Sequence, residues 1–144
     1  MQSLGPSGFR VICPEDCGNA PKKAQLRDFT AAAVQGDLHR VLAHISDRIE
    51  WEITGSGKFA GKEQFAEAQR QMHGKPAAEL EIRHILTHGK TGAVNGVVKY
   101  ADGKKRSFCD VYVFTGSAKD AKIREIVSYV IDHPGQETGD PAPS

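Results

Sequence analysis

AAAVQGDLHRVLAHISDRIEW, residues 31–51, decides the fold, because it contains two helix boundaries and the start of a strand. Gly36 is a typical residue just past the end of a helix, and Asp37, which follows it, is a typical N-cap. The next residues, RIEWEIT at 48–54, alternate between apolar and polar, which is the period of a strand. The stretch therefore predicts one helix, a second that begins at once, and a strand.

The residues before this stretch complete the first helix. KKAQLRDFTAAAVQ, residues 22–35, places Leu26, Phe29 and Ala33 on one helical face. Asn19 is the expected N-cap, because its side-chain oxygen can accept a hydrogen bond from a free backbone N–H. We expect this helix to pack its apolar face against a sheet.

The residues after the stretch change from helical to strand-like patterns. Residues 55–61 are rich in glycine and predict a loop, and GKEQFAEAQRQM at 61–72 predicts a third helix. Four strand-like runs follow, and the short turns between them favour antiparallel hairpins. These runs are residues 78–88, 93–100, 106–114 and 123–132. Three helices, an inserted strand and a four-strand meander predict an α+β domain in which a curved sheet wraps over helices.

The length of the chain fits one domain. A chain of 144 residues and 15.6 kDa is large enough to bury about two-thirds of the surface that its unfolded form exposes. Residues 1–19 are polar and contain Gly and Pro, so we expect an N-terminal arm. The domain itself is expected at 20–133, and the composition of residues 134–144 predicts a disordered tail.

Charge and hydropathy bear on partners and location. Nineteen Lys and Arg residues against eighteen Asp and Glu residues give a net charge of +1, too balanced for a nucleic-acid-binding surface. The chain contains no apolar run of the roughly 18 residues that a membrane span needs. The N-terminus lacks the charged and apolar regions of a signal peptide. We therefore expect a cytoplasmic protein that binds neither nucleic acid nor membrane.

The cysteine and histidine patterns do not predict a metal site. Cys13 and Cys17 could form a disulfide or share a metal, but the odd number of cysteines and the absence of a second ligand pair favour plain thiols. His84 and His88 have the spacing of a metal pair on a helix. On a strand, however, that spacing separates them by about 13 Å. We expect neither a metal nor another cofactor.

Two carboxylates have unusual positions in the strand patterns. Alternation places Trp51 and Ile53 on one strand face and Glu52 on the other, so the residues alone favour a solvated Glu52. Asp110 shares its face with the aromatic residues Phe108, Tyr112 and Phe114. A carboxyl group on such a face needs a partner or a raised pKa. A salt bridge from Asp110 to Lys99 on a neighbouring strand is the alternative.

The order of elements and four stretches resemble the nuclear-transport-factor-2-like superfamily. The stretches are AAAVQGDLHRVLAHISDRIEW, the GKEQF that begins at Gly61, FCDVYVF and IREIVSYVID, and the similarity covers residues 22–132. The superfamily includes ketosteroid isomerases, scytalone dehydratase and SnoaL-like polyketide cyclases. The resemblance implies a cone, in which a curved mixed or antiparallel sheet wraps around three N-terminal helices and encloses a pocket. It also implies a homodimer formed through the open sheet face.

The resemblance also assigns roles to single residues. The tyrosine position of ketosteroid isomerases falls on Phe29, their general base on Glu52 and their second acid on Asp110. This places Glu52 in the pocket as an ionised base and Asp110 there as a protonated hydrogen-bond donor. The epoxide hydrolases of the superfamily need an aspartate in the last strand, where this chain has Ser128. Epoxide hydrolysis is therefore disfavoured.

Further side chains are expected on the pocket wall. His84 is in step with Leu80, Ile82 and Leu86, so it is expected to face the interior, either as a core histidine or as a pocket residue. The complete set of expected substrate-binding residues is Phe29, Phe59, His84, Tyr112, Phe114, Ile126, Ser128 and Val130.

Together these features predict a small-molecule enzyme of the SnoaL-like or ketosteroid-isomerase-like type. Proton transfer next to a carbonyl of a largely apolar substrate is the expected chemistry, as in an isomerase, cyclase or dehydratase. The competing hypothesis is a ligand-binding or dimerisation module of the same fold without turnover. Phe29 supports the second hypothesis, because it lacks the hydroxyl of the tyrosine and so removes an oxyanion donor, which costs about 3 kcal/mol.

Overall fold

The computed structural model of the chain describes residues 2–4 and 8–134. Its helices are α1 (Pro21–Gln35), α2 (Leu38–Ala43) and α3 (Gly61–Met72). Its strands are β1 (Gln2–Leu4), β2 (Arg10–Ile12), β3 (Ile45–Ile53), β4 (Gly57–Ala60), β5 (Ala77–His88), β6 (Thr91–Tyr100), β7 (Lys105–Phe114) and β8 (Ile123–His133). No helix in this part of the chain is long and apolar enough to span a bilayer. Apart from Pro134, the expected disordered tail lies outside the described residues.

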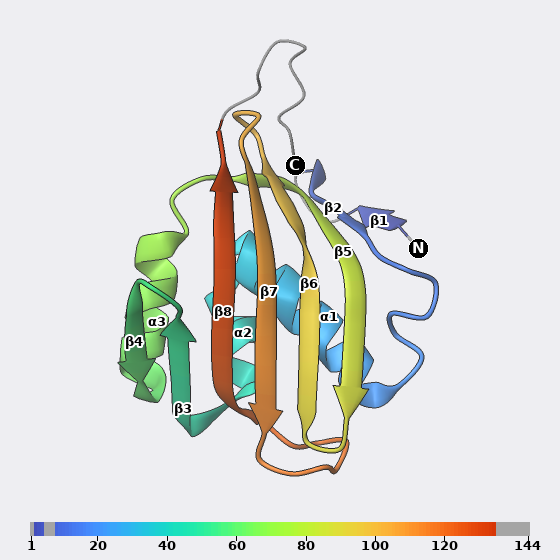
Figure 1. Ribbon diagram of the computed structural model, residues 1–144, viewed down its shortest axis with the longest axis vertical. Coiled ribbons are helices and arrows are strands. Elements are labelled where there is room, and N and C mark those ends of the chain that lie inside the picture. The colour runs from blue at the N-terminus through green and yellow to red at the C-terminus, as the bar shows by residue number, and fades with distance from the viewer. Residues whose placement is uncertain (1, 5–7, 135–144) are drawn as a thin grey trace.

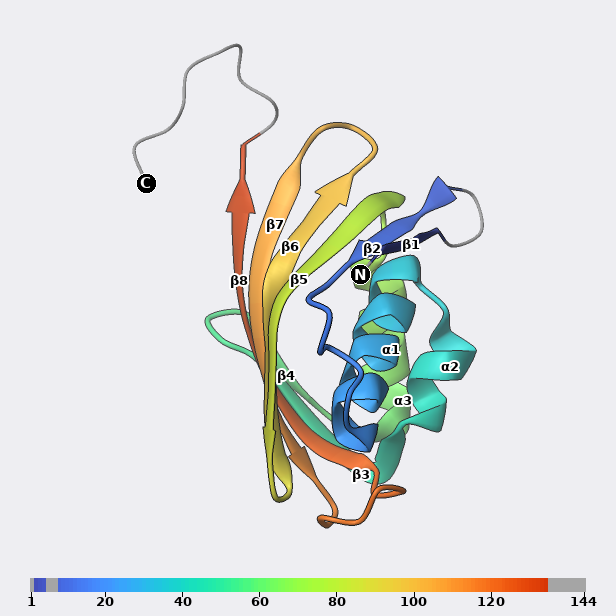
Figure 2. The same cartoon turned by 90° about the vertical axis from the view of Figure 1, so that its right-hand side faces the viewer.

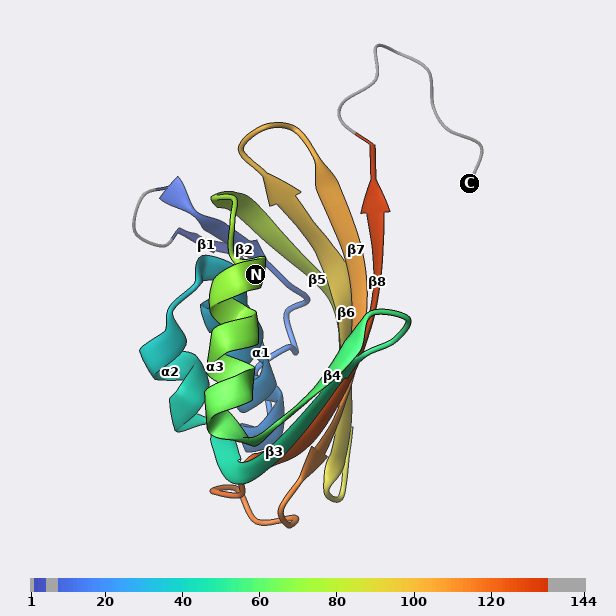
Figure 3. The same ribbon diagram turned by 90° about the vertical axis from the view of Figure 1, so that its left-hand side faces the viewer.

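The strands of the described residues form one open sheet in the order β1-β2-β5-β6-β7-β8-β3-β4 (Figure 1). Two neighbouring pairs, β2 with β5 and β3 with β8, are parallel, and the others are antiparallel. The long strands curve, and the three helices lie against the concave face (Figures 2 and 3). The predicted α+β cone with a mixed, curved sheet is confirmed.

The helix boundaries around Gly36 follow the expected chemistry. Gly36 has a φ of 75° and ends α1, and its N–H bonds the carbonyls of the last turn. The Asp37 carboxylate caps α2 by accepting a hydrogen bond from the Arg40 N–H at 3.3 Å. The predicted N-cap at Asn19 is wrong, because Ala20 occupies the N-cap position of α1. Pro21 at the first helical position needs no hydrogen-bond partner for its nitrogen.

A bulge in β5 supplies part of the sheet's curvature. The register between β5 and β6 shifts between Ile82 and His84, and Gly96 of β6 lies opposite Ile82. A Cβ atom at Gly96 would collide with the Glu81 carbonyl oxygen, so this close approach requires glycine. The extra residue inverts the alternation, and Ile85 instead of His84 faces the core. The expected interior position of His84 is therefore wrong.

Part of the expected loop at 55–61 forms an edge strand. β4 pairs antiparallel with β3, and Phe59 lies opposite Trp51 with 5.6 Å between ring centroids. The turn is closed by a 2.8 Å hydrogen bond from the Ser56 N–H to the Ile53 carbonyl. The strand has only four residues, too few for the sequence pattern to show an alternation.

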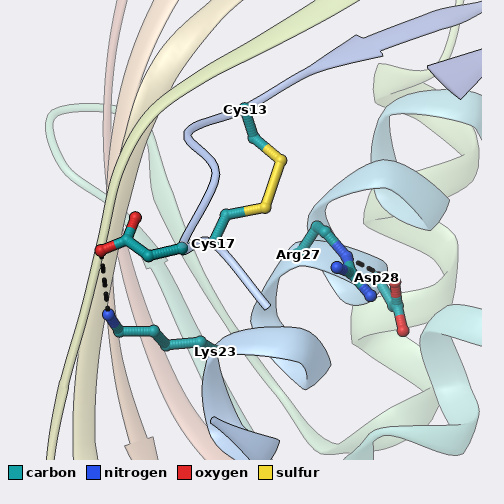
Figure 4. The surroundings of a disulfide bond; sticks show 6 residues. Cys13, Cys17, Lys23, Arg27 and Asp28 are labelled. Atoms are coloured by element: carbon teal, nitrogen blue, oxygen red, sulfur yellow. Dashed lines mark hydrogen bonds and ion pairs between the residues drawn. A yellow bond between two sulfur atoms is a disulfide. The ribbon is translucent and has the colours of Figure 1, made fainter. Parts of the chain in front are cut away.

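The N-terminal arm is held against the domain. β2 extends the sheet next to β5, and Phe9 is buried. Cys13 and Cys17 form a disulfide, with both side chains buried and an Asp16–Lys23 ion pair of 3.8 Å nearby (Figure 4). The expectation of plain thiols is wrong, because a turn closed by the Cys17 N–H and the Pro14 carbonyl brings the two side chains together.

Candidate active site

A cavity of about 390 Å³ lies between the concave face of the sheet and helices α1 and α3. Its wall includes alternate residues of β6, β7 and β8, because every second side chain of a strand faces the helices. On β7 these residues are Arg106, Phe108, Asp110 and Tyr112. The cavity therefore extends along the strands, with Tyr112 and Asp110 toward one end, here called the inner end, and Arg106 toward the other, here called the mouth.

A polar network spans three strands at the inner end. Asp110 and Tyr112 are two residues apart on β7, and the Tyr112 hydroxyl donates a 3.3 Å hydrogen bond to Asp110 Oδ2. Ser128 of β8 is the register partner of Asp110 and also hydrogen-bonds its carboxyl group. The indole Nε1–H of Trp51 on β3 donates to Ser128 Oγ at 3.0 Å. The network holds the Asp110 carboxyl group toward the cavity.

Burial controls the ionisation of this network. Desolvation raises the pKa of Asp110 to about 6, although hydrogen bonds from Ser128 and Tyr112 oppose the shift. Desolvation also raises the pKa of Tyr112 well above its usual range, so its phenol is neutral at pH 7. The predicted rise in the pKa of Asp110 is confirmed. At a pKa of about 6 the carboxylate is the main form of Asp110 at pH 7, whereas the sequence predicts a neutral acid.

The alternative partner of Asp110 lies elsewhere. Lys99 makes a 3.0 Å ion pair with Glu79 of β5, and Arg10 from the arm binds the same carboxylate at 2.7 Å. These two cations lower the pKa of Glu79, with the hydrogen bond from Lys99 as the main cause. Asp110 therefore keeps hydroxyl groups as its neighbours, and its carboxyl group is available to a bound molecule.

Helix α1 forms the opposite wall of the inner end. Phe29 meets Tyr112 edge to face, with ring centroids 5.9 Å apart. Thr30 lies beside Phe29, and its hydroxyl donates to the Leu26 carbonyl at 2.7 Å while also contacting the Tyr112 phenol. The phenol is thus fixed between α1 and β7. It points toward Asp110, where a ligand carbonyl can compete for its proton.

Charged side chains gather at the mouth. Arg106 donates from Nε and Nη2 to the two carboxylate oxygens of Asp132 on β8, at 2.6 and 3.4 Å. Lys75, in the connection from α3 to β5, lies 3.5 Å from Asp102 and 5.2 Å from the centroid of the Tyr100 ring. That connection crosses the upper end of the sheet in Figure 1. The mouth therefore has ion pairs in contact with solvent, unlike the inner end.

Six of the ten sequence-predicted site residues line the cavity. They are Phe29, Asp110, Tyr112, Ile126, Ser128 and Val130. Four others, Glu52, Phe59, His84 and Phe114, lie outside its lining.

Glu52 does not meet Asp110. Its neighbours Trp51 and Ile53 are buried and line the cavity, so the alternation of β3 directs Glu52 to the opposite, convex face. There it is the register partner of Lys58 on β4. The expected placement of Glu52 as a pocket base is therefore wrong. Strand alternation alone predicts this outer face for Glu52, whereas the resemblance to ketosteroid isomerases predicts the pocket.

The other three residues lie outside the cavity for separate reasons. Phe59 is the register partner of Trp51 on the edge strand β4 and packs beside its ring. Phe114 is fully buried, and the Lys22 ammonium lies 5.0 Å from the centroid of its ring. His84 is exposed on the convex face, where its Nδ1 hydrogen-bonds Asn95 Oδ1 at 2.9 Å.

Several lining residues were not predicted from the sequence. Arg106 and Asp132 continue the period-two pattern of Asp110 and Ser128, so strand alternation could have found them. Trp51 was correctly assigned to one strand face, but its bond to Ser128 required the parallel pairing of β3 with β8. Lys75 lies in a connection without periodicity, and the sequence holds no signal for it. Within the described residues, no group of three or more His, Cys, Asp or Glu side chains could hold a metal ion.

The cone and its enclosed network define a nuclear-transport-factor-2-like (NTF2-like) α+β protein. An NTF2-like protein of unknown function from Cytophaga hutchinsonii is 26% identical, with a TM-score of 0.58, over 75% of this chain and 97% of that one. A candidate ketosteroid isomerase from Kribbella flavida is 11% identical, with a TM-score of 0.63, over 86% and 91% of the two chains. A candidate SnoaL-like polyketide cyclase from Shewanella denitrificans is 10% identical, with a TM-score of 0.63, over 76% and 90%. Because the last two proteins are only 11% and 10% identical to this chain, their likeness shows the fold alone.

The particular family follows from the sequence match. The chain belongs to the SnoaL-like domain family, whose model matches residues 26–126. None of the curated proteins matches this chain. The resemblance predicted from sequence is confirmed at the level of fold and family.

Proposed function

We propose that the chain is a small-molecule enzyme in which Asp110 transfers a proton at a carbon next to a carbonyl group. The single observation that carries this proposal is the Asp110 carboxyl group, which has a pKa of about 6 and faces a cavity of about 390 Å³. A general base works best when its pKa lies near the working pH. A cavity of this size accepts a small organic molecule.

The proposed step uses two groups of β7. The ionised Asp110 carboxylate takes a proton from the α-carbon, so that the C–H bond breaks and its electron pair moves to the carbonyl oxygen. The neutral Tyr112 phenol turns from Asp110 and donates its hydrogen bond to the developing oxyanion. The protonated Asp110 then returns the proton to the same carbon or to another. Ser128 holds the carboxyl group in place throughout.

The proposed substrate is largely apolar between its polar ends. Between Asp110 and the mouth, the cavity wall includes Phe108 and Val130, and Val98, Phe29 and Ile126 also line it. These side chains offer no charged group to a ligand, so a substrate gains from burying hydrocarbon against them.

Hydrogen–deuterium exchange at the α-carbon of a ketone tests the proposal. In D₂O, NMR should show exchange of a bicyclic ketone that is catalysed by the wild-type protein and at least 100-fold slower with Asp110→Asn, because the base is lost. Glu52→Gln is the matched control, since it removes a carboxylate on the convex face, and its exchange rate should equal that of the wild type. Equal rates for the wild type and Asp110→Asn would refute the proposal.

A binding module without turnover is the second candidate function. Phe29 favours it, because it lies against Tyr112 where a second phenol would supply another oxyanion donor. A ketone that binds to the wild type without any α-exchange would support this candidate over the enzyme.

We also propose that the chain forms a homodimer through the convex face of the sheet. Large apolar side chains are exposed there, including Ile131 at 67%, Leu86 at 64% and Tyr129 at 50%. Tyr129 and Ile131 are neighbours on β8, and exposed apolar groups of this size favour a partner surface. Light scattering at micromolar concentration should give twice the monomer mass, and Ile131→Lys should give the monomer. A wild-type monomer would contradict the proposal.

The cytoplasmic location remains a prediction. The Cys13–Cys17 disulfide speaks against it, because the reducing cytosol rarely keeps such bonds.

A further inference from the structure

The two ends of the cavity have different chemistry, and β7 connects them. Asp110 and Arg106 are four residues apart on the same face of this strand, so their backbone positions are separated by about 13 Å. Phe108 lies between them, and Val130 lies between Ser128 and Asp132 on the adjacent strand. A molecule that fills the cavity therefore meets a carboxylate network, an apolar section and then a cluster of ions.

Arg106 at the mouth can bind an anion in addition to Asp132. Arg106 binds Asp132 through Nε and Nη2, while a guanidinium carries five N–H donors, so its remaining N–H groups can bind a further acceptor. The Asp132 carboxylate already has Arg106 as its partner, and this hydrogen bond lowers the pKa of the carboxyl group. A cationic ligand would have to displace Arg106, whereas an anion adds to it.

Lys75 supplies a second positive charge on the cavity wall. Its partner Asp102 is not among the lining residues, and both side chains are 46% exposed, so their 3.5 Å ion pair is weak in water. Of the charged side chains that line the mouth, Lys75 and Arg106 are positive and Asp132 is negative. His73 also lines this end and adds a ring nitrogen for hydrogen bonding. The cavity side of the mouth thus has an excess of positive charge.

We propose that the natural ligand is an apolar molecule with a carbonyl at one end and a carboxylate at the other, the carboxylate being bound by Arg106 and Lys75. This inference rests on the proposed function, because it assigns the carbonyl end to Asp110. The ionised Asp110 repels an anion from the inner end. The charges at the two ends therefore fix the direction in which the ligand enters.

Keto acids of two lengths, each with its neutral amide, test this assignment. 10-Oxoundecanoate has eight methylene groups between ketone and carboxylate, which span about 11 Å when extended at bond lengths near 1.5 Å. We expect NMR titration to show that it binds wild-type protein about 10-fold more tightly than 10-oxoundecanamide, and that added NaCl reduces this preference. 4-Oxopentanoate cannot reach both ends and should show no preference over its amide.

Variants at the mouth locate the effect. Lys75→Gln should reduce the preference for the carboxylate at least three-fold, and Arg106→Gln should remove most of it. The double variant Arg106→Gln/Asp132→Asn should show the same low preference as Arg106→Gln. This result would exclude repulsion of the ligand by an unpaired Asp132 as the cause. Lys104→Gln, on the exposed β6–β7 turn outside the cavity lining, removes the same charge as Lys75→Gln and should keep the full preference.

The inference would be overturned if wild-type protein bound 10-oxoundecanoate and its amide equally tightly. It would also be overturned if 4-oxopentanoate were preferred over its amide as strongly as the long keto acid, or if Lys104→Gln reduced the preference as much as Lys75→Gln. The proposed function fails separately. Its failure would appear as α-exchange of the neutral amide that persists in Asp110→Asn, whatever the carboxylate preference.

Discussion

Asp110 and Asp132 lie on the same concave face of neighbouring strands, yet their carboxyl groups have opposite ionisation behaviour. Asp110 is surrounded by hydroxyl groups and the cavity wall, and desolvation raises its pKa to about 6. Asp132 is at the solvent-exposed mouth, and the hydrogen bond from Arg106 lowers its pKa. Position along one cavity therefore decides whether a carboxyl group can exchange a proton near neutral pH or serves as a permanent anion.

The largest expected effect on stability concerns the charge on Asp110. Its pKa is raised in the folded state, so its favourable contribution is complete below about pH 4 and is lost as the pH rises through about 6. Relative to Asp110→Asn, the wild type should lose up to about 3 kcal/mol of unfolding free energy between pH 4 and pH 7. Urea denaturation of both proteins across this range measures the difference. A difference that does not change with pH would contradict the contrast between the two carboxyl groups.

An intermediate effect is expected when the inner network loses a member. Ser128→Ala leaves the buried Trp51 N–H without its partner, which should cost about 2 kcal/mol of unfolding free energy. It also removes a hydrogen bond that stabilises the charged carboxylate, so the pKa of Asp110 should rise further. Urea denaturation and NMR titration measure the two changes. Ser107→Ala, on the convex face, is the control: it removes an exposed 2.7 Å hydrogen bond to His133, so it should cost below about 1 kcal/mol and leave the pKa of Asp110 unchanged.

The smallest effect is expected at the mouth. Asp132→Asn removes the ion pair with Arg106, but the Asp132 side chain is 66% exposed, so the loss should be below about 1 kcal/mol. The pKa of Asp132 is lowered in the folded state, so its stabilising contribution is present above about pH 4 and is lost as the pH falls below that value. A double-mutant cycle with Arg106→Gln isolates the interaction. A coupling above about 2 kcal/mol would show that the mouth is as desolvated as the inner end.

The resemblance to ketosteroid isomerases predicts the wrong strand face for Glu52. Alternation in RIEWEIT separates Trp51 and Ile53 from Glu52, and the structure follows that alternation. The resemblance places the general base on Glu52, although a shift of one residue is enough to exchange the two faces of a strand. The periodicity of the chain's own residues was therefore the safer guide to which side chains share a cavity.

The sequence alone predicts the helices, the long strands and the inward face of β7, because these depend on local periodicity and on capping residues such as Gly36 and Asp37. From that periodicity it also indicated Asp110 as a carboxyl group with a raised pKa. Three other features come from the folded chain: the β5 bulge turns His84 outward, Trp51 donates a hydrogen bond to Ser128 across the parallel β3–β8 pair, and Lys75 lies at the mouth. These features depend on register and on contacts between residues far apart in the chain, and local sequence patterns do not encode either.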